Sequence, residues 1–251
     1  MVKRDDLVSY LDRTLELHSF HRDYSNNGLQ IEGADEIKKI VFAVDASLEL
    51  FEKAIDADFI IVHHGLSWGD NMKRIAGNMA GRVKVLMKND ISLYGAHLPL
   101  DAHSIYGHNA QLAHYLGLTE QEMFSKYSGV EIGVMGRLDS PKTVQEVGSV
   151  LAEKLDGDFA VIGNPNNTVE KIGIISGGGI SGVNDAVNAG LQCFITGEFK
   201  HEYYHTVKEL GIDVITLGHY YSEKPGLMAL MELISERYDV ECEFIDIPTG
   251  F

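Results

Sequence analysis

The sequence predicts an α/β fold with two interlinked domains, each built on an open, mostly parallel sheet. Short runs rich in β-branched residues alternate with segments whose apolar residues are spaced three and four positions apart. The predicted strands lie at 39–45, 58–64, 90–97, 171–176, 192–197 and 213–219. The predicted helices lie at 48–55, 143–155, 183–190 and 201–210. Strands and helices that alternate in this way are typical of sheets with helices on their faces.

Two stretches, 39–65 and 171–198, share one order of elements: strand, small-residue turn, helix, strand and polar turn. Each is followed by a third strand that ends in a histidine, with an acid four positions later. We therefore predict a first domain from residues 1–125 plus 226–251 and a second domain from residues 126–225. In this division the strand-like run at 241–248 returns to the first domain. The alternative is that the two stretches look alike only because all α/β units do.

The composition restricts the classes of function. The formal net charge is -16, and a nucleic-acid binder normally uses a basic patch to release counterions, so the charge disfavours that role. No apolar run approaches the roughly 20 residues that cross a bilayer, and the first residues lack the apolar stretch of a signal peptide. We therefore expect a cytoplasmic protein that does not enter a membrane. Cys193 and Cys242 lie in separate strand-like runs, which favours two buried thiols over a disulfide.

Histidines and acids gather at the predicted strand ends, where ligands bind in such sheets because the following turns are free to vary. These residues are His63, His64, His97, Asp101, His219 and Glu223. Neighbouring side chains in a regular strand point to opposite faces, so His63 and His64 can serve one site only if the strand has ended before Gly65. Imidazole and carboxylate ligands favour zinc, iron, manganese or another transition metal. We predict that the two distant segments meet to bind two such ions, with positions left open for water. In the plainer alternative the histidine pair caps a strand and the other residues lie on the surface.

Several motifs also carry a family resemblance. They are YSNNGLQIEG (24–33), IVHHGLSW (61–68), LYGAHLPLDAH (93–103), ITGE (195–198), GHYYSE (218–223) and FIDIP (244–248). In order and separation they closely resemble the NIF-three-like proteins, also known as GTP cyclohydrolase I type 2 homologues, over essentially the whole chain. The resemblance implies a dinuclear metal centre, two interlinked α/β domains and a ring-like homohexamer. It implies metal ligands at His63, His64, Asp101, His219 and Glu223, and His97 matches the pattern as well.

Two competing motifs point to other chemistry. Residues 201–205 spell HExxH on a predicted helix, which in zinc proteases places two histidines on one face with the glutamate as base. That assignment leaves the other histidines unexplained, and the alternative is an exposed helical face. Residues 177–182 match GxGxxG between a strand and a helix. This loop could hold a phosphate at the helix N-terminus, although a tight turn near the neighbouring domain is favoured.

Further side chains are candidates beside the predicted metal ligands. Glu198 follows a strand end and is a candidate catalytic acid or base; the alternative role is to support a ligand histidine. Trp68 would cover the site, stack on a base or simply pack. Four residues near the N-terminus would line the cleft, although their sequence is also good turn chemistry: Tyr24, Asn26, Asn27 and Gln30.

Two hypotheses for function follow. The leading one is a metal-dependent hydrolase of the GTP cyclohydrolase type, acting on a small-molecule substrate through metal-activated water. The alternative is a metal-stabilised ring that serves as a scaffold or binds nucleic acid on its inner surface.

Overall fold

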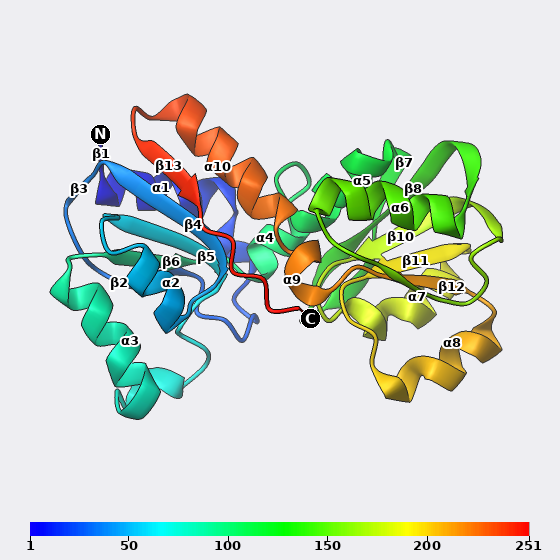
Figure 1. Ribbon diagram of the computed structural model, residues 1–251, viewed down its shortest axis with the longest axis horizontal. Helices are drawn as coiled ribbons and strands as arrows, with labels where there is room; N and C mark the ends of the chain where they lie inside the picture. The colour runs from blue at the N-terminus through cyan, green and yellow to red at the C-terminus, as the bar shows by residue number, and fades with distance from the viewer. Residues whose placement is uncertain (251) are drawn as a thin grey trace. The chain divides into compact units, whose positions relative to one another are not determined.

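The chain folds into two compact units, each with its own sheet, in the computed structural model that describes residues 1–250 (Figure 1). The first unit comprises Met1–Leu100 and Leu227–Ile247, and the second comprises Asp101–Gly226 and the segment that begins at Pro248. The predicted α/β class with two sheets of mostly parallel strands is confirmed. No helix within residues 1–250 is long and apolar enough to span a membrane.

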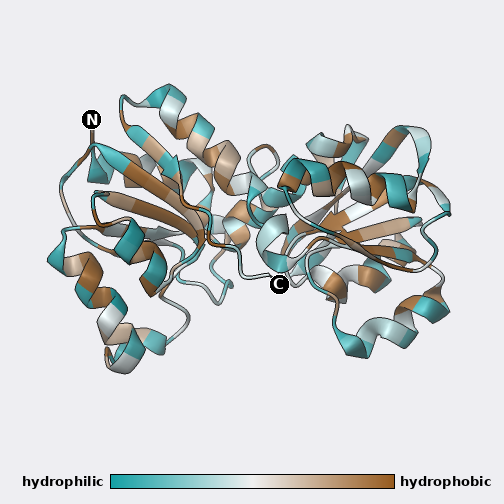
Figure 2. Ribbon diagram, in the orientation of Figure 1, coloured by the Kyte–Doolittle hydropathy of each residue, from teal (hydrophilic) through white to brown (hydrophobic). Residues whose placement is uncertain are grey.

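The first unit contains a five-stranded sheet in the order β13-β4-β5-β6-β2. The parallel core consists of β4 (Lys39–Asp45), β5 (Phe59–His64) and β6 (Ser92–Gly95). At one edge β13 (Glu241–Phe244), red in Figure 1, pairs in parallel with β4, and at the other β2 (Gly28–Ile31) pairs antiparallel to β6. The inner strands are nearly continuous hydrophobic runs, brown in Figure 2, as expected for strands that are covered on both faces.

Helices complete the core of the first unit. They are α1 (Arg4–Thr14), α2 (Leu48–Lys53), α3 (Gly77–Lys88) and most of α10 (Pro225–Arg237). Helix α2 begins after Ser47, whose hydroxyl accepts a hydrogen bond from the Leu50 amide and so caps the helix. Fully buried side chains of α2 and α3 pack with those of the strands: Val41, Leu50, Phe51, Ile60, Leu86 and Leu93. The remaining short elements are β1 (Val2–Lys3), β3 (Glu36–Ile37), η1 (Leu17–Ser19) and η2 (Asn71–Lys73).

The second unit contains a six-stranded sheet in the order β7-β8-β10-β11-β12-β9. Its parallel centre consists of β10 (Thr168–Ile175), β11 (Cys193–Thr196) and β12 (Asp213–Thr216). The antiparallel strands at its edges are β7 (Thr119–Tyr127), β8 (Val130–Thr143) and β9 (Ala160–Ile162). The centre of this sheet therefore repeats the parallel arrangement of the first unit, and its edges differ.

The helices of the second unit are α5 (His108–Leu116), α6 (Val144–Leu155), α7 (Val183–Asn188), α8 (Tyr204–Leu210) and α9 (His219–Ser222), with the short η3 (Gly179–Gly182) and η4 (His201–Tyr203). Helix α6 begins with a capping box, because the Thr143 hydroxyl accepts from the Glu146 amide while the Glu146 carboxylate accepts from the Thr143 amide. Its apolar face joins a core that includes Leu112, Leu116, Val147, Leu151, Ile174 and Ile195.

The structure differs from the sequence prediction at the first domain boundary. Residues 101–125 were expected in the first domain, but they belong to the second unit. The physical reason is packing, because Leu112 and Leu116 of α5 lie in the core of the second unit and β7 pairs with β8. Helix α4 (Leu98–Ala102) contains the boundary itself. Of the two cysteines predicted to be buried, Cys193 is buried, whereas Cys242, on the edge strand β13, is only partly so.

Candidate metal centre

The histidine pair of the first unit occupies the last two positions of β5. The strand ends directly before Gly65, as the prediction of a shared site required, and the two imidazole rings lie with their centroids 4.6 Å apart. The last pair of β5 with β6 joins Val62 to Gly95, so both histidines lie beyond that ladder. Because neither histidine is paired with β6, both imidazoles can turn toward one cluster at the end of the strand.

His97 completes a cluster of three imidazoles in the first unit. It follows β6, and its ring centroid lies 5.1 Å from that of His63 and 5.8 Å from that of His64. One ligand nitrogen from each of the three lies within 4.8 Å of the others. This separation suits nitrogen atoms that coordinate one metal ion or two adjacent ions.

Each of these histidines is oriented by an oxygen atom at Nδ1. The Nδ1 of the fully buried His63 donates to the carbonyl oxygen of Ala96 at 2.9 Å, because a carbonyl can only accept. The Nδ1 of His64 contacts Asp45 Oδ1 at 2.8 Å, and that of His97 contacts Asp23 Oδ1 at 2.9 Å. Neutral imidazoles held in this way carry their lone pair on Nε2. Metal-binding histidines characteristically have such a carbonyl or carboxylate partner.

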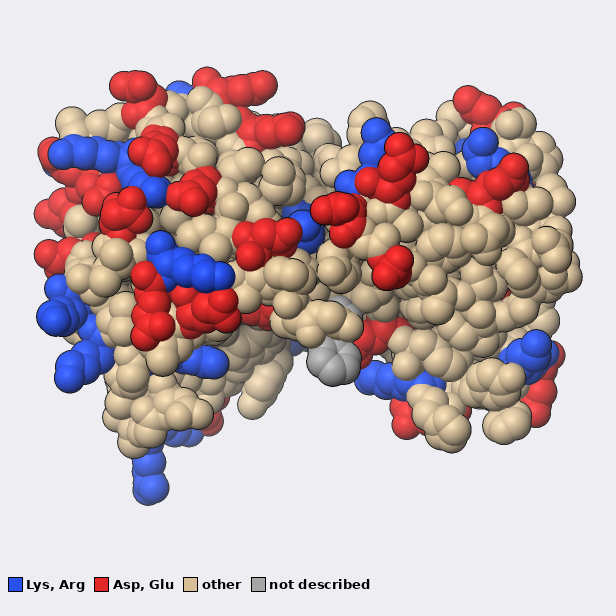
Figure 3. Space-filling view, in the orientation of Figure 1, with Lys and Arg blue, Asp and Glu red and all other residues tan. Residues whose placement is uncertain are grey.

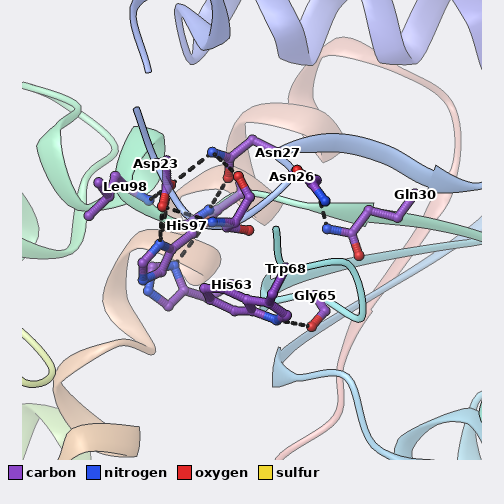
Figure 4. A network of polar contacts seen from close by, with 11 residues as sticks. Asp23, Asn26, Asn27, Gln30, His63, Gly65, Trp68, His97 and Leu98 are labelled. Atoms are coloured by element: carbon purple, nitrogen blue, oxygen red, sulfur yellow. Dashed lines mark hydrogen bonds and ion pairs between the residues drawn. The ribbon is translucent and has the colours of Figure 1, made fainter. Parts of the chain in front are cut away.

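Asp23 holds His97 and the start of the following helix through hydrogen bonds (Figure 4). Its carboxylate is 1% exposed and accepts from the ring of His97, the amides of Ser25 and Leu98, and the side chain of Asn27. Burial alone would raise the pKa of Asp23, but these hydrogen bonds and the nearby imidazole lower it below its usual value. The carboxylate is therefore ionised, so it holds the Nδ1 proton of His97 in place.

The predicted cleft residues instead support the turn after the histidine pair. Gln30 Oε1 accepts from the amides of Leu66 and Ser67, and a Cβ atom at Gly65 would overlap the Gln30 side chain. Asn26 donates to the Ser67 hydroxyl at 2.7 Å, and Asn27 Oδ1 accepts from the His97 amide at 2.8 Å. These polar side chains fix both segments that carry the three histidines.

The second unit places His219 between two carboxylates. Helix α9 begins at His219, whose Nδ1 lies 2.7 Å from Glu198 Oε1 and whose Nε2 lies 3.1 Å from Glu223 Oε1. Burial alone would lower the pKa of His219, but Glu223 and then Glu198 raise it to about 9. The acids create a site that attracts a proton, and for the same reason it would attract a metal cation.

Asp101 lies beside the same turn of the second unit. Its buried carboxylate accepts from the Ser176 hydroxyl at 3.0 Å, while Asn109 links the two segments by accepting from the Ser176 amide and donating to the Asp101 carbonyl. The next residue, Gly177, donates its amide to the Ser222 hydroxyl at 2.9 Å. The 176–177 turn therefore holds Asp101 on one side and α9 on the other.

The glycine-rich loop has a steric explanation within this unit. Gly177 has φ +56, and a Cβ atom there would overlap the Glu223 carboxylate and lie 3.1 Å from His219 Nε2. Cβ atoms at Gly179 and Gly182 would overlap Ile175. A carboxylate packed against this loop opposes phosphate binding, so the structure favours the tight turn over a dinucleotide loop.

The HExxH segment does not form a ligand cluster. His201 lies in η4 and His205 in α8, and both side chains are exposed. Among residues 1–250, no group of potential metal ligands includes either of them. The geometry therefore favours the exposed helical face.

Asp23 and Asp45 were missed by the sequence reasoning. Asp45 is the last residue of β4 and is paired in register with His64, so its place at a strand end was a usable signal. Asp23 lies in no regular element and its partner follows 74 positions later, so no local pattern identifies it.

The donor atoms fit divalent transition metals. The first unit offers imidazole nitrogens, and the second offers one imidazole with the carboxylates of Asp101 and Glu223. Mixed nitrogen and oxygen donors of this kind suit zinc, iron or manganese better than calcium or magnesium. That the two sets form one shared centre stays a prediction.

Comparisons with known proteins agree on one family. The model of the DUF34/NIF3 (NGG1p interacting factor 3) family matches residues 2–250. A protein of Archaeoglobus fulgidus named GTP cyclohydrolase 1 type 2 homolog is 46% identical over 98% of both chains, and one of Pyrococcus horikoshii with the same name is 42% identical over 98% of this chain and 99% of its own. The crystal structure of TTHA1606 from Thermus thermophilus is 37% identical, covers 100% of both chains and gives a TM-score of 0.89. The chain thus belongs to the DUF34/NIF3 family.

Proposed function

We propose that the chain is a metal-dependent hydrolase that binds two divalent transition-metal ions. The proposed ligands are His63, His64, His97, Asp101, His219 and Glu223. The observation that carries the proposal is the shared hydrogen bonding of the four histidines, each held at Nδ1 by an oxygen atom. The relatives named GTP cyclohydrolase 1 type 2 homolog make GTP the first substrate to test.

The number of ligands supports two ions. Six side chains divide into three for each ion, which is the usual protein ligand count of a catalytic site. When bound, two such ions lower the pKa of a coordinated water from about 15.7 toward 7, so they supply a nucleophile at neutral pH. Three ligands per ion leave coordination positions for that water and for substrate.

The chain's own residues orient these ligands and provide a group for proton transfer. Ala96, Asp45 and Asp23 keep the three histidines of the first unit in fixed orientations. Glu198 does the same for His219, and its side chain is 40% exposed. We therefore propose that Glu198 both positions His219 and exchanges a proton with solvent or substrate.

Reconstitution tests this function. The protein is stripped of metal, loaded with zinc, manganese or iron, and assayed with GTP and with a simple phosphoester. We expect turnover that depends on metal, and loss of both bound metal and turnover in His64→Ala and in His219→Ala. His201→Ala is the matched control, because it removes an exposed histidine of the second unit outside the cluster. Two bound ions without turnover of either substrate would contradict the enzyme proposal.

We predict that the protein assembles as a homohexamer and is located in the cytoplasm. The alternative function is a ring that binds nucleic acid. Lys and Arg side chains are interspersed with Asp and Glu on the face drawn in Figure 3. Several basic groups are paired, for example Lys39 with Asp56 and Glu243. Mixed charges on this face disfavour nucleic-acid binding there, and such binding would weaken steeply with salt.

A further inference from the structure

We propose that Tyr24 and Trp68 form an aromatic platform that binds the planar nitrogen heterocycle of a substrate, such as a purine base. The inference names a substrate class for the histidine cluster of the first unit, so it rests on the proposed function for the identity of that site. It concerns recognition of the ring, which the ligand geometry alone does not address.

The platform lies beside the histidine cluster. The Trp68 ring centroid is 4.9 Å from that of His97, in an edge-to-face arrangement, and 6.0 Å from that of His64. Figure 4 shows the indole together with His97 and with the Gly65 carbonyl that accepts from it. The Tyr24 ring is 6.5 Å from Trp68, with the two planes inclined by 36°. A heterocycle packed on these rings would therefore lie next to the ligand histidines.

Hydrogen bonds hold the indole of Trp68 and the backbone of Tyr24 in place. The Trp68 indole N–H donates to the Gly65 carbonyl at 2.7 Å, and its amide donates to Asn71 Oδ1 at 3.0 Å. The Tyr24 carbonyl accepts from the Gly69 amide at 2.8 Å. Gly69 has φ +46, and a Cβ atom there would lie 2.6 Å from the Tyr24 ring, so the glycine lets the ring approach the loop. An indole fixed before binding loses little conformational freedom when a ligand stacks on it.

Exposure distinguishes Tyr24 from the aromatic residues of the core. Its side chain is 70% exposed, the largest fraction among the exposed large hydrophobic residues of positions 1–250. It lies beside Trp68, whose ring neighbours that of His97. Stacking on aromatic side chains accepts any base, because every base has a π-face, and it commonly changes affinity tenfold or more.

The chain is acidic overall, and one cation near the platform is already paired. Lys73, five positions after Trp68, is paired with Asp70, and the chain carries a formal net charge of -16. A triphosphate would need cationic partners that are not already engaged by acids. We therefore assign the base or nucleoside part of a nucleotide to these two rings and assign no phosphate contact to them.

The sole tryptophan of the sequence provides the experiment, since Trp68 fluorescence reports on the platform alone. The metal-loaded protein is titrated with guanosine and, as the probe without a base, with ribose 5-phosphate. We expect saturable quenching by guanosine and none by ribose 5-phosphate. Equilibrium dialysis with labelled guanosine gives the affinity without an optical signal.

Substitutions of tyrosine locate the binding site. Tyr24→Leu should weaken guanosine binding about tenfold with unchanged metal content, because one stacking face is lost. Tyr24→Phe keeps the ring, and Tyr127→Leu removes an exposed tyrosine of the second unit, so both should bind guanosine as the unmodified chain does. Equal responses to guanosine and ribose 5-phosphate, or unchanged binding in Tyr24→Leu, would overturn the platform.

The outcome is separable from that of the hydrolase test. Guanosine binding that depends on Tyr24, in a protein without metal-dependent turnover, would support the platform while removing the enzyme proposal. Turnover of a phosphoester without any ring-dependent quenching would do the reverse.

Discussion

The ligand sets of the two units differ in charge. The first unit gathers three imidazoles and keeps its carboxylates, Asp23 and Asp45, at their Nδ1 atoms. The second unit places one imidazole between Glu198 and Glu223, which raises the pKa of His219 to about 9. The candidate ligands of the first unit are imidazoles alone, whereas those of the second include two buried carboxylates, Asp101 and Glu223, whose charge a proton or a cation compensates. Metal removal should therefore disturb the second unit more than the first.

Removing the metal with a chelator tests this contrast, and we expect it to have the largest effect on stability. A ligand present at 1,000 times its dissociation constant stabilises the folded state by about 4 kcal/mol, so chelation should lower Tm by roughly 10 °C. Calorimetry measures the shift, and amide hydrogen exchange shows where protection is lost. We expect greater loss at residues 218–223 than at residues 62–65. Equal losses in both segments would contradict the electrostatic contrast.

Neutralising one acid should reduce affinity in the second set. Glu223→Gln keeps the shape of the side chain but removes the charge that contributes most to the raised pKa of His219. We expect zinc affinity to fall more than about 100-fold, beyond the 10–100-fold range typical of groups that only support a ligand. Competition with a chromophoric chelator measures it, with Glu202→Gln, an exposed acid of η4, as the control. Affinity within tenfold of the unmodified chain would show that Glu223 is not a ligand.

Adjacent glycines offer a matched steric pair. Gly177→Ala places a methyl group against Glu223 and a non-glycine residue at φ +56, whereas a Cβ at Gly178 meets nothing within 4 Å. We expect Gly177→Ala to lower the free energy of unfolding by about 2 kcal/mol and to weaken metal binding, with Gly178→Ala nearly neutral. Urea denaturation and elemental analysis check both variants. Equal effects of the two substitutions would show that the loop does not constrain Glu223.

Substituting the carboxylates that support a histidine should give the smallest losses of metal affinity, and the two losses should be similar. The side chains of Asp45 and Glu198 are each 40% exposed and each holds one histidine at Nδ1. Asp45→Asn and Glu198→Gln should therefore each weaken metal binding about tenfold, at the low end for such groups. Turnover at saturating metal separates the roles of Glu198. Full recovery in Glu198→Gln would limit it to positioning, and a persistent loss would support proton transfer.

The strands that sequence reasoning located best are the buried ones. The run at 39–45 coincides with β4 because every position from Ile40 to Val44 is buried, so its hydrophobicity is uninterrupted. Strand β7 was not predicted, because its sequence TEQEMFSKY is mostly exposed and polar at the edge of the sheet. It exists because the turn at Ser128 and Gly129, both with positive φ, folds it onto β8.

The sequence predicted those site residues that lie together in short motifs. Paired histidines and His-x-x-x-acid spacings marked His63, His64 and His219 directly. The residues that orient them come from distant positions, as Asp23 does for His97, and only tertiary structure brings such pairs together. The GxGxxG motif at 177–182 was ambiguous, because the same sequence pattern is compatible with a phosphate-binding loop and with a tight turn. Contact with Glu223 distinguishes them.

The edge strand β13 sets the order in which the chain can be completed during synthesis. β4 receives its outer parallel neighbour only from residues 241–244, after the ribosome has made all of residues 101–226. All strands of the later-made unit lie within residues 101–226, so its sheet can form while the earlier-made sheet still exposes the edge of β4. A nascent chain stalled before residue 241 would therefore hold a complete second sheet and an incomplete first one.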